Sequence, residues 1–172
     1  CLYGDSRGHL WVGTDDSGFY WNGQNWKDFS AMPGWHQQTS VGSFYEDRRG
    51  HIWASIEGST WRFDGHQWAQ ILTDFQALAY GEAPGQVLWI GGNEGLIHYE
   101  VGTGVQARFD HENSGLPVNK VRDVHVDRDG TAWVSYFDVE AKWKPPWWAV
   151  GVSVILFAAL FGLVWRDRHS GL

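Results

Sequence analysis

One phrase of residues, Asp-x-x-Gly followed by a short apolar run with a tryptophan, recurs with small variations along the chain. Its occurrences are Asp5-Ser-Arg-Gly8-His-Leu-Trp11, Asp47-Arg-Arg-Gly50-His-Ile-Trp53, Glu82-Ala-Pro-Gly85-Gln-Val-Leu-Trp89 and Asp127-Arg-Asp-Gly130-Thr-Ala-Trp133. The tryptophans lie 42, 36 and 44 residues apart. This period suits one four-stranded blade of a β-propeller, and it is too irregular for a tightly stacked solenoid.

Each repeat contains the signals of four short strands. Residues 43–46 and 121–126 alternate with a period of two, as a strand with one buried face does. In the Asp-x-x-Gly turn, the carboxylate can accept hydrogen bonds from N–H groups and the glycine can adopt a positive φ. The strand with the repeated Trp follows, and the next two strands flank Asn22-Gly23 and Asp64-Gly65, which are strong hairpin signals. Four antiparallel strands per repeat make one blade.

The repeats do not complete a ring. The third repeat lacks the turn aspartate, so we expect a looser first hairpin there, and the fourth stops following the pattern near residue 136. The predicted fold is therefore all-β, with about three and a half four-stranded propeller blades over residues 1–136. Typical propellers have four to eight blades. We expect a piece cut from a longer protein, with open blade faces that pair with the remaining blades or with a second copy.

These repeats carry a family resemblance. The core Asp-x-x-Gly-x-Leu-Trp-Val-Gly-Thr at residues 5–14, the strand Gly95-Leu-x-x-Tyr99 and the segment Ser114-Gly-Leu-Pro117 resemble the two-component regulator propeller repeat of bacterial hybrid sensor proteins. The resemblance covers nearly all of residues 2–136. It implies an extracytoplasmic propeller that senses a ligand, often a saccharide. The signal would pass through one transmembrane helix to a histidine kinase, which this sequence does not contain.

An uncharged apolar stretch, residues 147–165, follows the repeats. As a helix its 19 residues would extend about 28 Å, close to the roughly 30 Å hydrocarbon core of a bilayer. Aromatic and basic residues mark the membrane interface at its ends: Trp147, Trp148, Trp165, Arg166 and Arg168. We therefore predict a juxtamembrane linker over 137–146, a transmembrane helix over 147–165 in contact with the lipid bilayer, and a short polar tail over 166–172.

Charge does not fix the orientation of this predicted helix, because Lys142 and Lys144 before it balance Arg166 and Arg168 after it. The resemblance implies a single-pass protein of the bacterial inner membrane with a periplasmic propeller. A tail-anchored protein with a cytoplasmic propeller is the alternative. The family places a small β-sandwich before the helix, and the short linker of this chain leaves no room for one, so the chain departs from the family layout.

Composition and motifs argue against several functions. A net charge of −7 disfavours nucleic acid as a partner. The His residues show no metal-ligand spacing, and Asp127-x-Asp129-Gly130 resembles the start of a calcium loop without the ligands that should follow. No nucleotide-binding loop or nucleophile motif occurs. We therefore expect no catalytic residue, metal or cofactor, and we assign His9 and His51, which share one turn position, a structural role.

Aromatic residues outside the repeated position are the ligand-binding candidates, namely Trp21, Trp35 and Trp61. Sugars stack on indole faces, although core packing is the competing interpretation for each residue. The predicted function is the non-catalytic sensory and membrane-anchoring portion of a two-component regulator. Two alternatives stay open: a membrane-anchored propeller scaffold without signalling, and a propeller lyase with a metal and a catalytic His in its channel.

Overall fold

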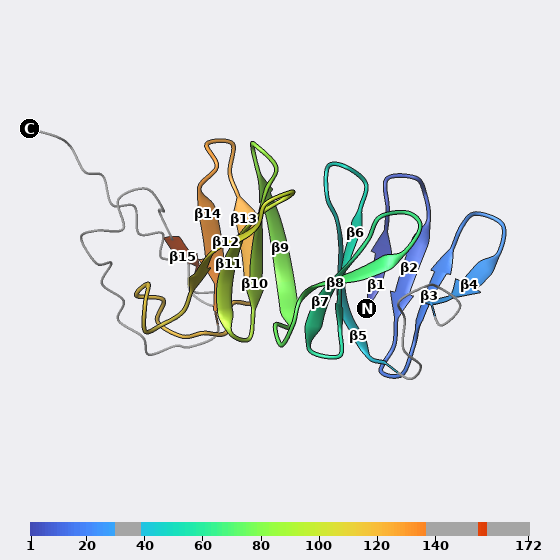
Figure 1. Ribbon diagram of the computed structural model, residues 1–172, viewed down its shortest axis with the longest axis horizontal. Coiled ribbons are helices and arrows are strands. Elements are labelled where there is room, and N and C mark those ends of the chain that lie inside the picture. Colours follow the sequence, from blue (N-terminus) through green and yellow to red (C-terminus); the bar gives the residue numbers. More distant parts are fainter. Residues whose placement is uncertain (30–38, 137–154, 158–172) are drawn as a thin grey trace, which may run out of the picture. The chain divides into compact units, whose positions relative to one another are not determined.

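The computed structural model describes residues 1–29 and 39–136, and the backbone of residues 155–157 (Figure 1). The chain divides into two compact units, Cys1–Ala79 and Tyr80–Leu172. All regular elements in the described residues are strands. The all-β prediction is therefore confirmed for the described part of the chain.

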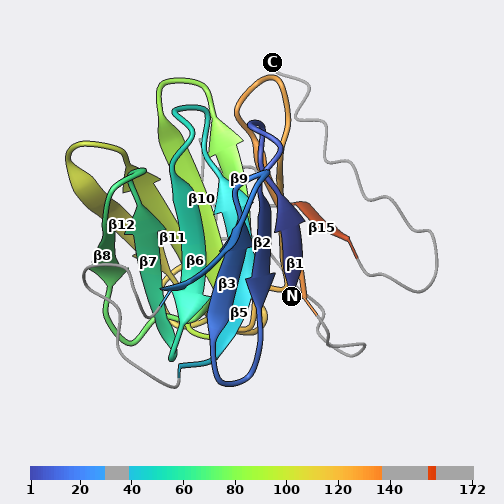
Figure 2. The same cartoon turned by 90° about the vertical axis from the view of Figure 1, so that its right-hand side faces the viewer.

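The first unit holds two four-stranded antiparallel sheets. The first sheet has the order β1 (Leu2–Gly4), β2 (Leu10–Gly13), β3 (Gly18–Trp21) and β4 (Trp26–Asp28). The second has the order β5 (Val41–Glu46), β6 (Ile52–Ile56), β7 (Ser59–Phe63) and β8 (Trp68–Leu72), and Figure 2 shows β6, β7 and β8 side by side. Sequential strands are neighbours in both sheets, which is the meander expected of a propeller blade.

The third four-stranded sheet contains β9 (Ala77–Ala83), β10 (Val87–Gly92), β11 (Gly95–Glu100) and β12 (Gly104–Phe109). Strand β9 begins in the last residues of the first unit, and the other three strands belong to the second. A further sheet pairs β13 (Asp123–Val126) with β14 (Ala132–Ser135), which corresponds to the predicted half repeat. The predicted four-stranded blades are confirmed for the first three repeats.

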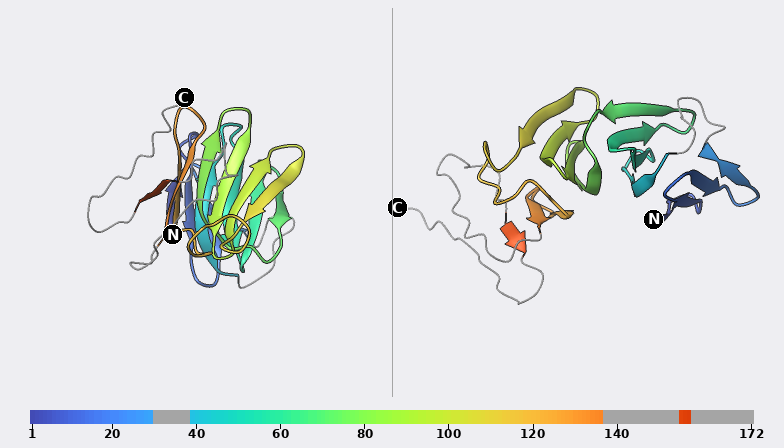
Figure 3. Two further views of the ribbon diagram at one scale, coloured as in Figure 1. Left: turned by 90° about the vertical axis from the view of Figure 1, so that its left-hand side faces the viewer. Right: turned by 90° about the horizontal axis from the view of Figure 1, so that it is seen from below.

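Strand β15 (Ile155–Phe157) pairs in parallel with β14 and completes a three-stranded sheet (Figure 3). These three residues form a strand where the sequence predicted helix. A short apolar run fits either structure, and β14 offers it an edge with free ladder groups. The rest of the predicted linker, membrane helix and tail lies outside the described residues, so these domain boundaries stay predictions. Within the described ranges, no helix has the length and apolar character of a membrane crossing.

An aromatic-rich core lies between the two sheets of the first unit. Trp11 at its centre is 2% exposed, and the other buried members are Phe29, Val41, Ile52, Ala54, Ile56, Phe63 and Trp68. The ring of Trp11 lies 5.5 Å from that of Phe29, which comes from its own repeat. It lies 5.7 Å from Phe63 and 6.2 Å from Trp68, which come from the next repeat. The repeated indole therefore joins one blade to the next.

Equivalent residues of the first two repeats lie 42 positions apart, and their strands pair in the same register. Strand pairing places Trp21 opposite Trp26 in the first sheet and Phe63 opposite Trp68 in the second. Each pair flanks a turn in which Asn22 or Asp64 accepts hydrogen bonds from two following backbone N–H groups. The same local chemistry thus produces the same hairpin, and each side chain in the first repeat has a definite counterpart in the second.

Glycine two residues after the repeated tryptophan allows adjacent sheets to approach closely. A Cβ added at Gly13 would lie 2.7 Å from the Val41 carbonyl oxygen and 2.8 Å from the Val41 Cβ. At Gly91, the equivalent position of the third repeat, an added Cβ would lie 2.6 Å from Val121 Cγ1. Val41 and Val121 also donate equivalent backbone hydrogen bonds, to the Thr14 and Gly92 carbonyls. Both glycines are therefore required by close contact with a valine of the following repeat.

We predict that Gly13→Ala destabilises the chain by about 1–3 kcal/mol, because the added methyl group would have to displace the Val41 backbone. The urea midpoint of unfolding, followed by far-UV circular dichroism, measures the effect. Gly4→Ala is the matched control in the same sheet, since nothing lies within 4 Å of a Cβ added there. Equal midpoints for the two variants would contradict the requirement for close approach.

Candidate functional site

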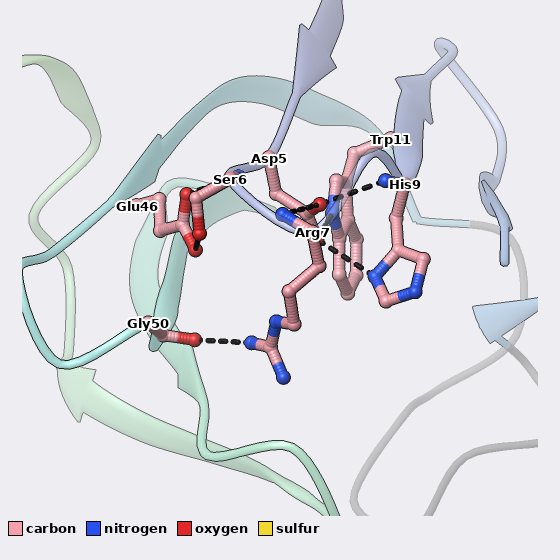
Figure 4. A network of polar contacts seen from close by, with 7 residues as sticks. All are labelled: Asp5, Ser6, Arg7, His9, Trp11, Glu46 and Gly50. Carbon is pink, nitrogen blue, oxygen red and sulfur yellow. Dashed lines mark hydrogen bonds and ion pairs between the residues drawn. The ribbon is translucent and has the colours of Figure 1, made fainter.

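The Asp5 carboxylate organises the first repeated turn through four hydrogen bonds (Figure 4). Its Oδ1 accepts the backbone N–H groups of Arg7 and His9, at 3.0 and 2.8 Å. Its Oδ2 is 2.9 Å from His9 Nδ1 and accepts the indole N–H of Trp11 at 3.0 Å. The Gly8 N–H donates to the Asp5 carbonyl, and Gly8 has a φ of 81°. This is a type I turn followed by a left-handed glycine, a common three-residue hairpin loop.

The second repeat has the same arrangement around Asp47. Oδ1 accepts the backbone N–H groups of Arg49 and His51, both at 3.0 Å. Oδ2 accepts the indole N–H of Trp53 at 2.9 Å and lies 3.0 Å from His51 Nδ1. Since an ionised carboxylate only accepts hydrogen bonds, Nδ1 of each of these His rings carries a hydrogen. Trp53 is fully buried, so Asp47 satisfies an indole N–H that water cannot reach.

The fourth repeat keeps the carboxylate and the indole but not the imidazole. Asp127 Oδ1 accepts the backbone N–H groups of Asp129 and Thr131, and Oδ2 accepts the indole N–H of Trp133 at 3.0 Å. Thr131 stands where His9 and His51 stand in the first two repeats. Asp127 and Asp129 therefore belong to a hairpin turn of the repeat. In the part of the chain that the structure describes, no three His, Cys, Asp or Glu side chains are grouped to hold a metal ion.

The third repeat closes its first hairpin by a different turn. Ala83 occupies the position of the aspartate, and residues 84–86 join β9 to β10. Gly85 and Gln86 have φ values of 83° and 67°, so two successive residues are left-handed. No aspartate is present at this position to accept the turn N–H groups, and the expectation of a looser hairpin stays a prediction. Trp89 lies 4.8 Å from the ring of His98 on the neighbouring strand.

Two opposing effects set the pKa of the Asp5 carboxyl. Burial raises that pKa, but hydrogen bonds from the Trp11 indole, the His9 backbone and the His9 ring together outweigh it, so the pKa lies below the usual 3.8. At Asp127 the Trp133 indole is the largest cause of a lowered pKa. Both carboxyls are therefore ionised at neutral pH, which is the form that accepts every bond in the turn.

Polar contacts join the first turn to the second sheet of the same unit. The backbone N–H and hydroxyl of Ser6 donate to the Glu46 carboxylate at 2.6 and 2.7 Å, and Arg7 donates to the Gly50 carbonyl at 2.6 Å (Figure 4). The Tyr3 hydroxyl accepts the Glu46 N–H at 3.1 Å. The turn thus fixes its own tryptophan and also contacts the blade that covers that tryptophan.

The aromatic ligand candidates do not come together in one site. Trp21 is half-buried and pairs with Trp26 across β3 and β4, with ring centres 5.6 Å apart. Trp61 is half-buried and packs against the core of the first unit. Trp35 and the predicted interface residues Trp147, Trp148, Trp165, Arg166 and Arg168 lie outside the described residues.

The sequence analysis did not include Trp26 among the ligand-binding candidates. In the structure its side chain is 55% exposed. Its counterpart in the second repeat, Trp68, is 4% exposed. The signal was present in the matching Gly23-x-x-Trp26 and Gly65-x-x-Trp68 spacings, which place both indoles at one structural position. Only the structure shows that the position is covered in one repeat and open in the other.

We predict that Asp47→Ala lowers the free energy of unfolding by about 2–4 kcal/mol, because the buried Trp53 N–H and the turn N–H groups lose their acceptor. Chemical denaturation measures the change. The control is Asp64→Ala, which also removes two hydrogen bonds to backbone N–H groups but at an exposed turn without an indole. Its expected cost is about 1 kcal/mol or less, and a cost equal to that of Asp47→Ala would refute the role of the buried indole.

The lowered pKa of Asp5 also predicts a pH dependence. Its ionised form is favoured by folding, so its contribution to stability is complete above the unfolded-state pKa near 3.8 and is lost as the pH falls through the folded-state value. The melting temperature of the wild type should therefore drop more steeply below pH 4 than that of Asp5→Asn. Parallel profiles for the two proteins would show that Asp5 does not contribute to acid unfolding.

Comparison with known proteins finds a family model that matches the first of these turns. Residues 1–16, which contain the Asp5–Trp11 turn, match the family model described as "Two component regulator propeller". No curated protein matches the chain.

Solved structures share the fold. The extracellular domain of BT4673 from B. thetaiotaomicron, described as a hybrid two component system, aligns with a TM-score of 0.62 and 20% identity over 78% of this chain and 18% of that chain. The extracellular domain of the hybrid two component system BT3049 from the same organism aligns with a TM-score of 0.63 and 22% identity, over 78% of this chain and 20% of that chain. The chain thus spans about a fifth of either structure. The chain therefore resembles the two-component regulator propeller repeat at residues 1–16, and its described blades share the fold of these two extracellular domains.

Proposed function

We propose that the chain is part of the extracytoplasmic sensor of a two-component signalling protein. The observation that carries the proposal is the two-component regulator propeller repeat at residues 1–16, on blades that share the fold of extracellular domains from two such systems. Its role is non-catalytic, with kinase activity supplied by sequence outside this chain. The apolar stretch at residues 147–165 would anchor the propeller as a single-pass protein of the bacterial inner membrane.

The blade contacts suit a rigid recognition module. Three of the four repeated indoles donate to a buried or partly buried carboxylate, and the Asp5 turn contacts the next blade through Ser6 and Arg7. Loops held by such a scaffold can keep a fixed geometry for a ligand. A ligand that binds one packing of the blades better than another would shift their equilibrium, which is the physical requirement for signalling.

A saccharide is the ligand class that we propose. Exposed indole faces can stack on sugar rings, and Trp26 with its neighbour Trp21 offers such faces in the first repeat. A propeller scaffold that anchors or interacts without signalling is the second candidate. It is favoured by the same open aromatic face, because such faces also bind protein partners.

The location of the propeller can be tested on the full chain in a bacterial host, since Cys1 is the single cysteine and is exposed. We expect a membrane-impermeant maleimide to label Cys1 in cells with a permeabilised outer membrane and an intact inner membrane. Cys1→Ser is the control for specificity. Labelling that requires lysis of the inner membrane would contradict an extracytoplasmic propeller.

Ligand binding is tested on the same purified chain with a panel of neutral and acidic oligosaccharides. A saccharide that binds only the folded state at 100 times its Kd should add about 2.7 kcal/mol of stability, seen as a rise in Tm. Extracytoplasmic labelling without any binding from the panel would favour the scaffold over the saccharide sensor.

A further inference from the structure

The two aspartate turns of the first unit expose positive charge. Arg7 in the first turn and Arg49 in the second occupy the same position of the repeat, 42 residues apart, and both are exposed. The Arg7 guanidinium donates to the carbonyl of Gly50, the residue after Arg49, at 2.6 Å (Figure 4). The two cationic side chains therefore extend from turns that touch each other. We call Arg7, His9, Arg49 and His51 the cationic turn surface.

The matching negative charges lie inside the turns. The Asp5 and Asp47 side chains are 0% and 2% exposed, and each carboxylate accepts backbone and indole N–H groups. The Glu46 carboxylate accepts two hydrogen bonds from the first turn. Among the described residues, neither Arg7 nor Arg49 forms an ion pair. This surface therefore presents cations outward, although the whole chain has a net charge of −7.

The two turn histidines add hydrogen-bond acceptors to this surface. His9 and His51 each direct Nδ1 to a turn aspartate, so Nε2 of the neutral ring is an acceptor. Their side chains are 26% and 23% exposed. Figure 4 shows the second ring nitrogen of His9 directed away from Asp5. A ligand can therefore meet cationic donors and neutral acceptors on the same surface.

The place of these turns in a blade keeps them accessible in a complete ring. Neighbouring blades of a propeller pack around a central channel through the faces of their sheets. The aspartate turns instead lie at the ends of strands, where they join β1 to β2 and β5 to β6. Further blades would pack beside the cationic turn surface rather than over it. Loops on a rigid scaffold are also where binding residues are common.

We propose that the cationic turn surface binds an acidic oligosaccharide. The guanidinium groups of Arg7 and Arg49 bind its carboxylates, because a guanidinium forms paired hydrogen bonds with a planar carboxylate. The contact of Arg7 with Gly50 uses only one of its five N–H donors. The Nε2 atoms of the two turn histidines accept hydroxyl groups of the same sugar. A uronic acid ring carries both kinds of group.

This inference rests on the proposed saccharide sensor, and it adds a ligand class and a site separate from Trp26. Calorimetric titration of the purified full chain in mild detergent tests it. Oligogalacturonate is the acidic probe, and its methyl ester is an uncharged probe with the same sugar rings. We expect the acid to bind about tenfold more tightly than the ester, because only the acid offers carboxylates to the guanidinium groups.

Arg49→Gln should weaken oligogalacturonate binding about tenfold, because it removes charge-assisted hydrogen bonds. Arg49 contributes its backbone N–H to the turn, so the melting temperature of this variant should equal that of the wild type. Arg108→Gln is the matched control, since it removes the same charge from an exposed side chain on strand β12. Equal affinities for the acid and the ester, or equal effects of the two substitutions, would overturn the proposal.

Indole N–H resonances of the chain labelled with nitrogen-15 locate the ligand. Trp11 and Trp53 donate to the aspartates of the two turns, so we expect oligogalacturonate to shift their resonances. Shifts confined to Trp26 would support the saccharide sensor but overturn the turn site. Equal shifts with inorganic phosphate would show a simple anion site and overturn the saccharide assignment. If neither sugar probe binds, this proposal is wrong, whereas the sensor is tested separately by the wider panel and the labelling of Cys1.

Discussion

In three of the four repeats, a hydrogen bond from the repeated indole to a turn carboxylate links the hairpin to the packing of the blade. One aspartate closes the hairpin with one oxygen and orients the tryptophan with the other, as at Asp5 and Trp11. The oriented ring then fills the space between its own sheet and the next. The ionised aspartate therefore stabilises the turn and, by orienting the indole, also stabilises the contact between blades.

The strands and turns of the repeats were predictable because their signals are local. Alternation, Asp-x-x-Gly and Asn-Gly or Asp-Gly each act within a few residues, and all are found as expected in the first two repeats. The third repeat was less predictable. Its Gly85-Gln86 turn uses a left-handed glutamine, a residue type that carries no turn signal, so the conformation of this turn could not be predicted from the sequence.

Whether each aromatic side chain is buried or exposed could not be predicted, because its burial depends on which residues of the neighbouring blade pack against it. Trp26 and Trp68 have the same spacing from a turn glycine and the same strand position, yet one is open and the other covered. Exposure at such a position is set by the neighbouring blade and not by the repeat itself. The bond from the indole N–H to the turn carboxylate was also missed, although the constant six-residue separation of Asp and Trp in three repeats could have indicated it.

The equal register of the first two sheets has a consequence for how such chains change in evolution. Because equivalent residues lie 42 positions apart and pair in the same way, recombination between the two repeats at matching codons would delete or duplicate one whole unit. Each product would retain an aspartate before its tryptophan and an aromatic pair to receive the preceding indole. Blade number can therefore change in single genetic steps without creating a new type of contact.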